Sequence, residues 1–307
     1  MSEQINMNDA AARSLGSANS YAVYTDKFDP SQLNPMPRSA ARGDYGITGK
    51  EFVGVDTWHC HEATFLLDNG LPLAGTLKVI CPSDSEFMVE SKSFKLYLNT
   101  FDMCKMGKTI DEAITNYEQQ VKTDVSACIG ANVDVKFFRS GADRLISDDP
   151  GKNYIDLYSY ITTDQLESIQ ITDYSSSEFH SVVDDSTATS QESHYFTNVL
   201  RSRCRHTKQK DTGTAYFHIK TKRGVVNPVE LLKLVISLRE VNEFHEFCAE
   251  KLYIELMSNP LIEECSVMLL YARRGSLDIC PVRATRPALI SPVIKSTYYY
   301  TVKTMGQ

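Results

Sequence analysis

Residues 62–81, EATFLLDNGLPLAGTLKVIC, contain two strand-like runs separated by a turn. The runs EATFLL and GTLKVIC are rich in apolar and β-branched side chains, and the intervening DNGLP is typical of a turn. The stretch ESKSFKLYLNTFDM at 90–103 follows and predicts a helix. The N-terminal half is therefore expected to contain an antiparallel strand pair followed by a helix.

A second helix is predicted further along the chain. Thr109 and Glu112 have the spacing of a capping box. Apolar residues then recur at three- and four-residue steps, which is the period of a helix with one buried face. These residues are Ile110, Ala113, Ile114, Tyr117, Val121 and Val125. GANVDVKFF at 130–138 alternates as a strand does, so this unit is expected to end in a strand.

The same order of elements returns in the C-terminal third. GTAYFHIKTKRG at 213–224 predicts a hairpin, and Asn227-Pro228 predicts the N-cap and first residue of the helix VELLKLVISLRE. A further helix is expected over 242–258 and a last strand over 266–275. The chain reads strand, strand, helix, helix, strand twice. This pattern predicts an α+β protein with antiparallel sheets, built from two tandem β-β-α-α modules.

Composition divides the chain into four parts. Residues 1–50 contain several prolines and glycines without a sustained period, which predicts an arm lying over the body. Residues 139–195 are polar and acidic, which is typical of a solvated connector with little packed structure. The first module is then expected over 51–138 and the second over 196–307.

Charge, hydropathy and cysteine spacing exclude several classes of protein. The net charge is −7 without a long Lys or Arg run, so we expect no direct nucleic-acid partner. No apolar stretch suits a membrane span or an export signal, so we expect a cytoplasmic protein without membrane association. The eight cysteines lack CxxC or zinc-ligand spacing, which favours reduced thiols and no metal site.

Cys204 is the first candidate for chemistry. It lies in VLRSRCRHTKQKDTG, where basic side chains on both sides favour thiolate over thiol. Asp211 is the nearest carboxylate downstream and could act as a general acid if burial raised its pKa. A lone cysteine is more often buried or inert, so the residues alone leave both interpretations open.

Three further clusters have functional and ordinary interpretations. Glu90, Ser91 and Lys92 stand at a predicted helix start, which suits either a phosphate-bearing ligand or an ordinary cap. His245 and Glu246 are adjacent, so on a helix they point about 100° apart and suit two contacts to one ligand better than a metal. The arginines at 273–274 precede Gly275 and suit either phosphate binding or a solvated pair.

These clusters together resemble a known family. VESKSFKLYLNTF at 89–101 resembles the signature ESKSxKLYLxSF of the 7-cyano-7-deazaguanine reductases, usually called QueF. Cys204 and Asp211 match the family's C-x6-D catalytic pair, and FHE at 244–246 matches its FHE. ARRGSLDICP resembles its RRGGLDINP, and FDPSQLNPMPR resembles the start of its long, two-module members. The resemblance extends from about residue 14 to 283.

The resemblance implies a fold and a reaction. The long members of the family adopt the tunnelling fold (T-fold), with two fused modules, and suggest a homodimer. They reduce the nitrile of 7-cyano-7-deazaguanine to 7-aminomethyl-7-deazaguanine, a precursor of the tRNA nucleoside queuosine, and consume two NADPH. We therefore expect a small 7-deazapurine nitrile as substrate and NADPH as cofactor.

The resemblance also implies residue roles. Cys204 would be the nucleophile that forms a thioimide, Asp211 the acid that protonates the nitrile nitrogen, and His245 a residue that holds the substrate and moves protons. The residues expected to bind the substrate are Val89, Glu90, Ser91, His245 and Glu246. Those expected to contact NADPH are Ser91, Lys92, Arg274 and Gly275.

The chain departs from the family around Cys204. This chain has CRHTKQKDTG where the family has CLxTHQPDWG. Thr212 therefore replaces the family's Trp, and Lys208 and Lys210 replace its His and Pro. The Tyr-Thr that commonly precedes Arg-Arg-Gly is missing, which predicts a shorter turn there. Two alternatives remain open: a related amidinotransferase, which lacks the NADPH signature, and a protein of this fold that only binds a purine or pterin.

Overall fold

The computed structural model describes residues 27–141, 146–174, 180–205 and 207–303. Its centre is one eight-stranded sheet in which neighbouring strands are antiparallel, except that the outermost strand β7 is parallel to β9. The strands in spatial order are β5 (Asp134–Arg139), β3 (Pro72–Pro82), β2 (Val53–Leu66), β13 (Leu277–Ala284), β12 (Ile262–Tyr271), β10 (Lys210–Thr221), β9 (Glu192–Arg203) and β7 (Ile155–Asp156). The predicted α+β class is confirmed.

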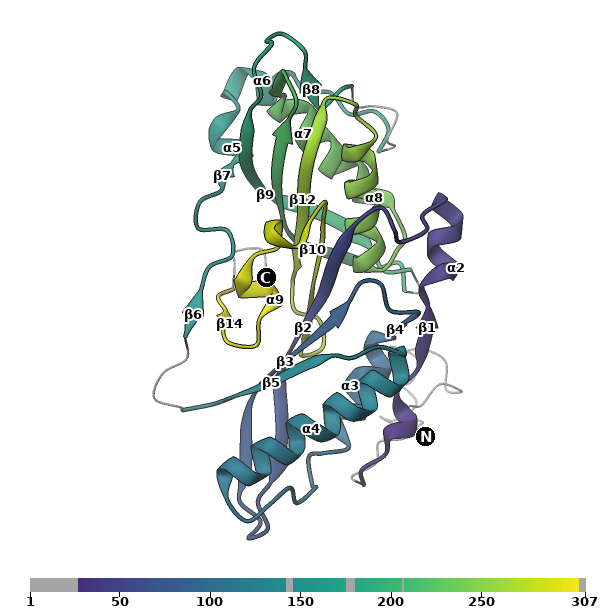
Figure 1. The fold of residues 1–307 in the computed structure, drawn as a ribbon, viewed down its shortest axis with the longest axis vertical. Helices are drawn as coiled ribbons and strands as arrows, with labels where there is room; N and C mark the ends of the chain where they lie inside the picture. The colour runs from purple at the N-terminus through teal and green to yellow at the C-terminus, as the bar shows by residue number, and fades with distance from the viewer. Residues whose placement is uncertain (1–26, 142–145, 175–179, 206, 304–307) are drawn as a thin grey trace, which may run out of the picture.

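Four main helices accompany the sheet. Figure 1 shows α3 (Ser91–Asn99) and α4 (Ile110–Ile129) with one half of the elongated molecule, and α7 (Pro228–Ile236) and α8 (His245–Met257) with the other. Each helix pair buries apolar side chains against the strands of its own half, which gives two separate hydrophobic cores. No helix in the described ranges is long and apolar enough to cross a membrane.

Local sequence signals explain where these helices begin and end. The Thr109 hydroxyl accepts a hydrogen bond from the Glu112 amide at 3.2 Å, so the predicted start of α4 is confirmed. Gly130 ends the same helix with a φ of 70°, a left-handed conformation that glycine adopts without a steric penalty. Asn227 caps α7, with Pro228 as its first residue, as the sequence predicts.

One strand prediction is wrong, and one strand was not predicted. Residues 213–224 do not form a hairpin: most of them belong to the single strand β10, which pairs with β9 before it and β12 after it. The turn-like residues 222–224 lie beyond the end of β10. Strand β13 was not expected, because Pro281 lies within it and proline is rare inside a central strand.

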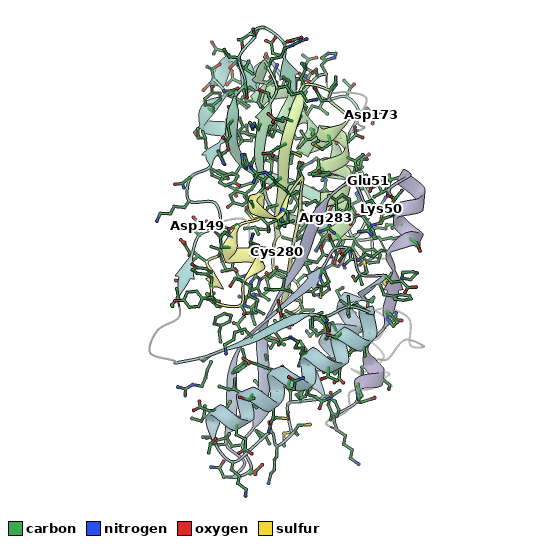
Figure 2. All side chains as sticks on the ribbon, viewed as in Figure 1. Lys50, Glu51, Asp149, Asp173, Cys280 and Arg283 are labelled. Carbon is green, nitrogen blue, oxygen red and sulfur yellow. The ribbon has the colours of Figure 1, made fainter. Side chains whose placement is uncertain are left out.

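β13 joins the two halves of the molecule. It pairs with β12 on one side and, from Leu277↔Cys60 to Ala284↔Val53, with β2 on the other. Figure 2 shows Cys280 and Arg283, both on β13, near the middle of the molecule. The unexpected strand therefore makes the sheet continuous.

The stretch expected to be a solvated connector is partly packed. It contains the short elements β6 (Ser147–Asp148), β7, α5 (Leu157–Tyr160), α6 (Thr163–Ser168) and β8 (Val183–Asp184). Leu157, Ile161, Val182 and Val183 are buried in the core around α7 and α8. These few apolar side chains anchor the stretch, and the polar sequence between them obscured this.

The two ends of the described chain cover the sheet and its helices. In the arm, β1 (Pro35–Pro37) pairs with β4 (Phe87–Val89), and α2 (Arg38–Arg42) follows directly. At the other end, α9 (Pro292–Lys295) and β14 (Tyr300–Thr301) lie against β2 and β3. There, the buried Lys78 ammonium donates to the carbonyls of Val293, Ser296 and Tyr299.

Candidate active site

A cavity of about 500 Å³ lies between the two halves. The first half contributes Trp58 and the β4–α3 junction, the second half contributes the β9–β10 loop and the start of α8, and β13 with the turn before it completes the wall. All ten residues that the sequence singles out for a role line this cavity: Val89, Glu90, Ser91, Lys92, Cys204, Asp211, His245, Glu246, Arg274 and Gly275.

Cys204 lies at the start of the loop between β9 and β10. Its amide donates to the Gln209 carbonyl at 2.9 Å, and its carbonyl accepts from the Lys208 amide at 3.0 Å. These two bonds close the 204–209 loop tightly, with Lys208 at a φ of 58°. The thiol is half-buried at the cavity wall. His206, one of the basic neighbours of Cys204 in the sequence, lies outside the described residues.

The Asp211 carboxyl is held by two basic side chains. Its Oδ1 accepts from Nη1 of Arg274 at 2.7 Å, and its Oδ2 lies 3.4 Å from Nε2 of His245. Burial raises the pKa of this carboxyl, but the hydrogen bond and charge of His245 and the charge of Arg274 together bring the pKa below its usual value. Asp211 is therefore ionised at neutral pH and must gain a proton before it can act as an acid.

His245 and Glu246 open helix α8 and each presents a buried polar atom without a partner among the described residues. The His245 ring stacks on Tyr271 with centroids 3.7 Å apart, and its Nδ1 has no hydrogen-bond partner. Glu246 is 1% exposed and its Oε1 is likewise unpartnered. Burial raises the pKa of Glu246 to about 7. Such atoms at a cavity wall are suited to hydrogen bonds with a ligand.

Glu90 is the N-cap of α3. Its carboxylate accepts from the Lys92 amide at 2.9 Å and the Ser93 amide at 2.7 Å. Two of the N–H groups that a phosphate could use at this helix start are thus engaged by Glu90. Val89 is buried, whereas the Lys92 side chain is exposed at the cavity.

A tight turn carries Arg274 and Gly275 into the cavity wall. The Arg274 amide donates to the Leu277 carbonyl at 2.7 Å, and Gly275 and Ser276 have φ of 57° and 73°. The short turn therefore needs two consecutive left-handed residues. A Cβ on Gly275 would lie 3.5 Å from Nζ of Lys95, so a further cation adjoins this turn.

The sequence did not single out several residues of the cavity. Glu243 is 7% exposed, lines the cavity and forms an ion pair with Arg205 at 3.1 Å, which links the residue after Cys204 to the segment before α8. Its place two residues before His245 was the available signal. Thr207 and Lys95 lie within the quoted motifs but were given no role, and Trp58 gave no signal, because its position at the wall depends on contacts distant in sequence.

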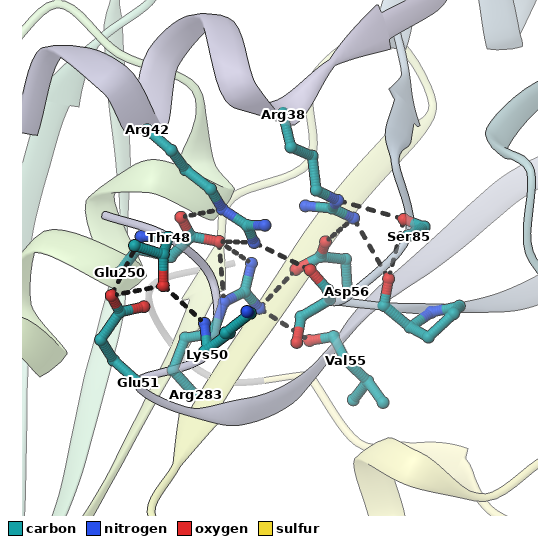
Figure 3. A network of polar contacts seen from close by, with 12 residues as sticks. Arg38, Arg42, Thr48, Lys50, Glu51, Val55, Asp56, Ser85, Glu250 and Arg283 are labelled. Atoms are coloured by element: carbon teal, nitrogen blue, oxygen red, sulfur yellow. Dashed lines mark hydrogen bonds and ion pairs between the residues drawn. The ribbon is translucent and has the colours of Figure 1, made fainter. Parts of the chain in front are cut away.

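A buried network of charges lies behind Glu246. Figure 3 shows Arg283 between Asp56 and Glu250, with Arg38 on Asp56 and Arg42 on Glu250. The four ion pairs span 2.6 to 2.9 Å and all five side chains are buried. The network ties the arm, the sheet and α8 together. The nearby charge of Asp56 adds to burial in raising the pKa of Glu246.

Comparison with known proteins identifies the class to which this fold and site belong. Residues 24–137 match the model of a nitrile reductase family, described as 7-cyano-7-deazaguanine-reductase N-term. The chain is 32% identical over 293 residues to the NADPH-dependent 7-cyano-7-deazaguanine reductase of Polaromonas sp. (strain JS666 / ATCC BAA-500), which covers 94% of this chain and 98% of that relative. It is 33% identical over 272 residues to the enzyme of the same name from Rickettsia typhi (strain ATCC VR-144 / Wilmington), covering 88% and 93% of the two chains. The chain belongs to the 7-cyano-7-deazaguanine reductase family.

Proposed function

We propose that this protein reduces the nitrile of 7-cyano-7-deazaguanine to the primary amine, 7-aminomethyl-7-deazaguanine, in queuosine biosynthesis, with two NADPH. The observation that carries this proposal is the convergence on one cavity of Cys204, Asp211 and a carboxyl oxygen of Glu246 that has no hydrogen-bond partner in the described part of the chain. The volume of this cavity, about 500 Å³, suits a purine-sized base and part of a second ligand.

Cys204 is the proposed nucleophile. Its sulfur adds to the nitrile carbon, the carbon–nitrogen triple bond becomes a double bond, and a thioimide forms. The ionised Asp211 takes the thiol proton and delivers it to the nitrile nitrogen, so the carboxylate is restored at the end of the step. Cys204 and Asp211 lie at the two ends of the connection between β9 and β10. The hairpin therefore fixes the position of the nucleophile relative to the proton carrier.

Glu246 and His245 are the proposed recognition residues. An ionised Glu246 accepts hydrogen bonds from the ring N–H and exocyclic amine of a guanine-like base, which are donors that the nearby apolar wall cannot satisfy. Val89, Glu90 and Ser91 lie at the β4–α3 junction and would contact the base from the other half of the cavity. Among the residues that the structure describes, His245 Nδ1 has no partner, so it can make a substrate or proton contact.

The cavity also fits a phosphate-bearing cofactor. Lys92, Lys95 and Arg274 supply three cationic groups at its wall, and Gly275 leaves the wall open beside them. When bound, NADPH supplies the hydrides. Ser91, Lys92, Arg274 and Gly275 would hold it, and the surrounding apolar side chains exclude water from the thioimide.

We further propose that the chain consists of two tandem T-fold modules, over 51–138 and 196–307, with the arm before them and the connector between them. In each half two long strands precede two main helices; one strand, β5, follows the helices in the first half, and two strands, β12 and β13, follow them in the second. The sheet ends at β5 and at the two-residue β7, so edge backbone groups remain that a second copy could pair with in a homodimer. The eight thiols suit a cytoplasmic location.

The test is NADPH oxidation that depends on 7-cyano-7-deazaguanine, followed by mass spectrometry of the product. Nitrile-dependent oxidation with the aminomethyl base as product is expected. Adduct formation without NADPH oxidation would indicate an amidinotransferase-like protein. Binding of the base with neither adduct nor oxidation would indicate a ligand-binding protein, and either result contradicts the proposal.

A further inference from the structure

Arg274 contacts the reacting side of the cavity, although the family resemblance leads us to expect a cofactor contact there. Its Nη1 donates to Asp211 Oδ1 at 2.7 Å, and its Nη2 donates to Thr207 Oγ1 at 3.1 Å and to Gln209 Oε1. The three acceptors come from residues 207–211, the segment that closes the loop beginning at Cys204. One guanidinium therefore connects the turn before β13 to three side chains of this segment.

We propose that Arg274 is a positioning residue for the addition of Cys204 to the nitrile, a step that takes place without cofactor. This inference rests on the proposed function. Arg274 holds Asp211 ionised and fixes the loop so that the carboxylate can take the thiol proton. In that step the sulfur–carbon bond forms, the nitrile loses one π bond, and the thiol proton passes through Asp211 to nitrogen.

The geometry of guanidinium makes this role specific to arginine. Its planar fork offers donors on two nitrogens in fixed directions, so one side chain can bind the carboxylate and both loop side chains together. A lysine ammonium is a point charge and cannot match three separated acceptors in the same way. Arg274→Lys would thus keep the positive charge but lose the fixed set of contacts to Asp211 and the loop side chains.

The backbone of Arg274 is itself fixed. Its amide donates to the Leu277 carbonyl at 2.7 Å, and the Leu277 amide donates back to its carbonyl at 3.3 Å. This bridge fixes where the side chain starts, immediately before the left-handed residues Gly275 and Ser276. Within the described residues, Lys92 and Lys95 form no ion pair, so other cations can meet cofactor phosphates while Arg274 holds the loop.

The experiment measures the rate of thioimide formation with 7-cyano-7-deazaguanine in the absence of NADPH, by quenching and intact-protein mass spectrometry. Arg274→Ala and Arg274→Lys are expected to slow adduct formation roughly 10- to 100-fold, the effect of losing a hydrogen bond to a charged group. Arg223→Ala removes an equal charge from an exposed ion pair with Asp185 and is expected to keep the wild-type rate. Gln209→Ala leaves Arg274 in place and is expected to slow adduct formation severalfold without changing the KM for NADPH.

Two results overturn the inference. Wild-type adduct rates in the Arg274 variants, with a raised KM for NADPH, would make Arg274 a cofactor ligand alone. A wild-type rate in Gln209→Ala would show that the bond to the loop has no positioning effect, even if the Arg274 variants fail to fold. If the wild-type protein itself forms no adduct, the proposed function fails, which is a distinguishable outcome.

Discussion

The carboxyl of Asp211 lies 3.4 Å from Nε2 of His245, whose ring is stacked face to face on Tyr271. The stacking fixes the imidazole plane, so one ring nitrogen is directed to Asp211, while the other, Nδ1, is buried without a partner in the described chain. A carboxylate and an imidazole thus meet at the cavity wall in an arrangement suited to proton transfer.

Asp211→Asn is expected to slow thioimide formation by roughly 10² to 10⁴, the usual contribution of a positioned acid–base group. The amide cannot take the thiol proton, but it keeps the size of the carboxyl, so binding of the nitrile base should be largely retained. Stopped-flow kinetics with calorimetric measurement of base affinity separates the two effects. A wild-type adduct rate in this variant would refute the proton-transfer role.

Binding of the nitrile base should strengthen as pH rises through about 7. The pKa of Glu246 is raised to about 7 by burial, and only the ionised form accepts both N–H groups of the base. Below that pH, affinity should fall about tenfold per pH unit, because a rising fraction of protein must lose a proton to bind. Calorimetry in buffers of different ionisation enthalpy should show proton release near neutrality, and its absence would contradict the assignment.

The same group makes stability depend on pH. Glu246 has a higher pKa in the folded protein than its ordinary value of 4.5, so the folded state binds more protons between 4.5 and about 7. Its contribution to the free energy of unfolding is therefore present at acidic pH and is lost as pH rises through that window. Urea titrations at several pH values should show that the free energy of unfolding declines less with rising pH in Glu246→Gln than in wild type. An equal decline in both proteins would contradict this.

Asp56→Asn is expected to destabilise the fold by about 3–5 kcal/mol, because it leaves Arg38 and Arg283 buried with a lost counter-charge. The midpoint of urea unfolding measures this. Asp185→Asn is the matched control: it breaks an exposed carboxylate–arginine pair and should leave the midpoint unchanged. Equal midpoints for the two variants would show that the buried network contributes no more to stability than the exposed ion pair.

Local features of the fold could be predicted because they depend on nearby residues. Thr109 and Asn227 mark helix starts through hydrogen bonds that reach only three residues along the chain. Strand β13 was missed because its signal, an uninterrupted buried run containing Pro281, conflicts with local preference. Its place is fixed by pairing with β2, more than two hundred residues earlier in sequence.

The candidate site shows the same contrast between features set by nearby residues and features set by distant contacts. The motif around Glu90, the Cys204–Asp211 spacing, the FHE triplet and the Arg-Arg-Gly run are short and occur in the family's order, so the family resemblance singled out ten residues that line one cavity. The contact between Arg274 and Asp211 could not be predicted, since 63 residues separate the two. The arm residues Arg38 and Arg42 also gave no local signal, because their carboxylate partners lie on β2 and α8.

The intact mass of the protein after incubation with 7-cyano-7-deazaguanine, without NADPH, tests the role of Cys204 most directly. Wild type is expected to gain the mass of one base, whereas Cys204→Ala gains none. Cys128→Ala is the control, because Cys128 is also half-buried but lies outside the cavity, and it should gain the mass as wild type does. An adduct that persists in Cys204→Ala, or is absent from wild type, would contradict the assignment of Cys204 as the nucleophile.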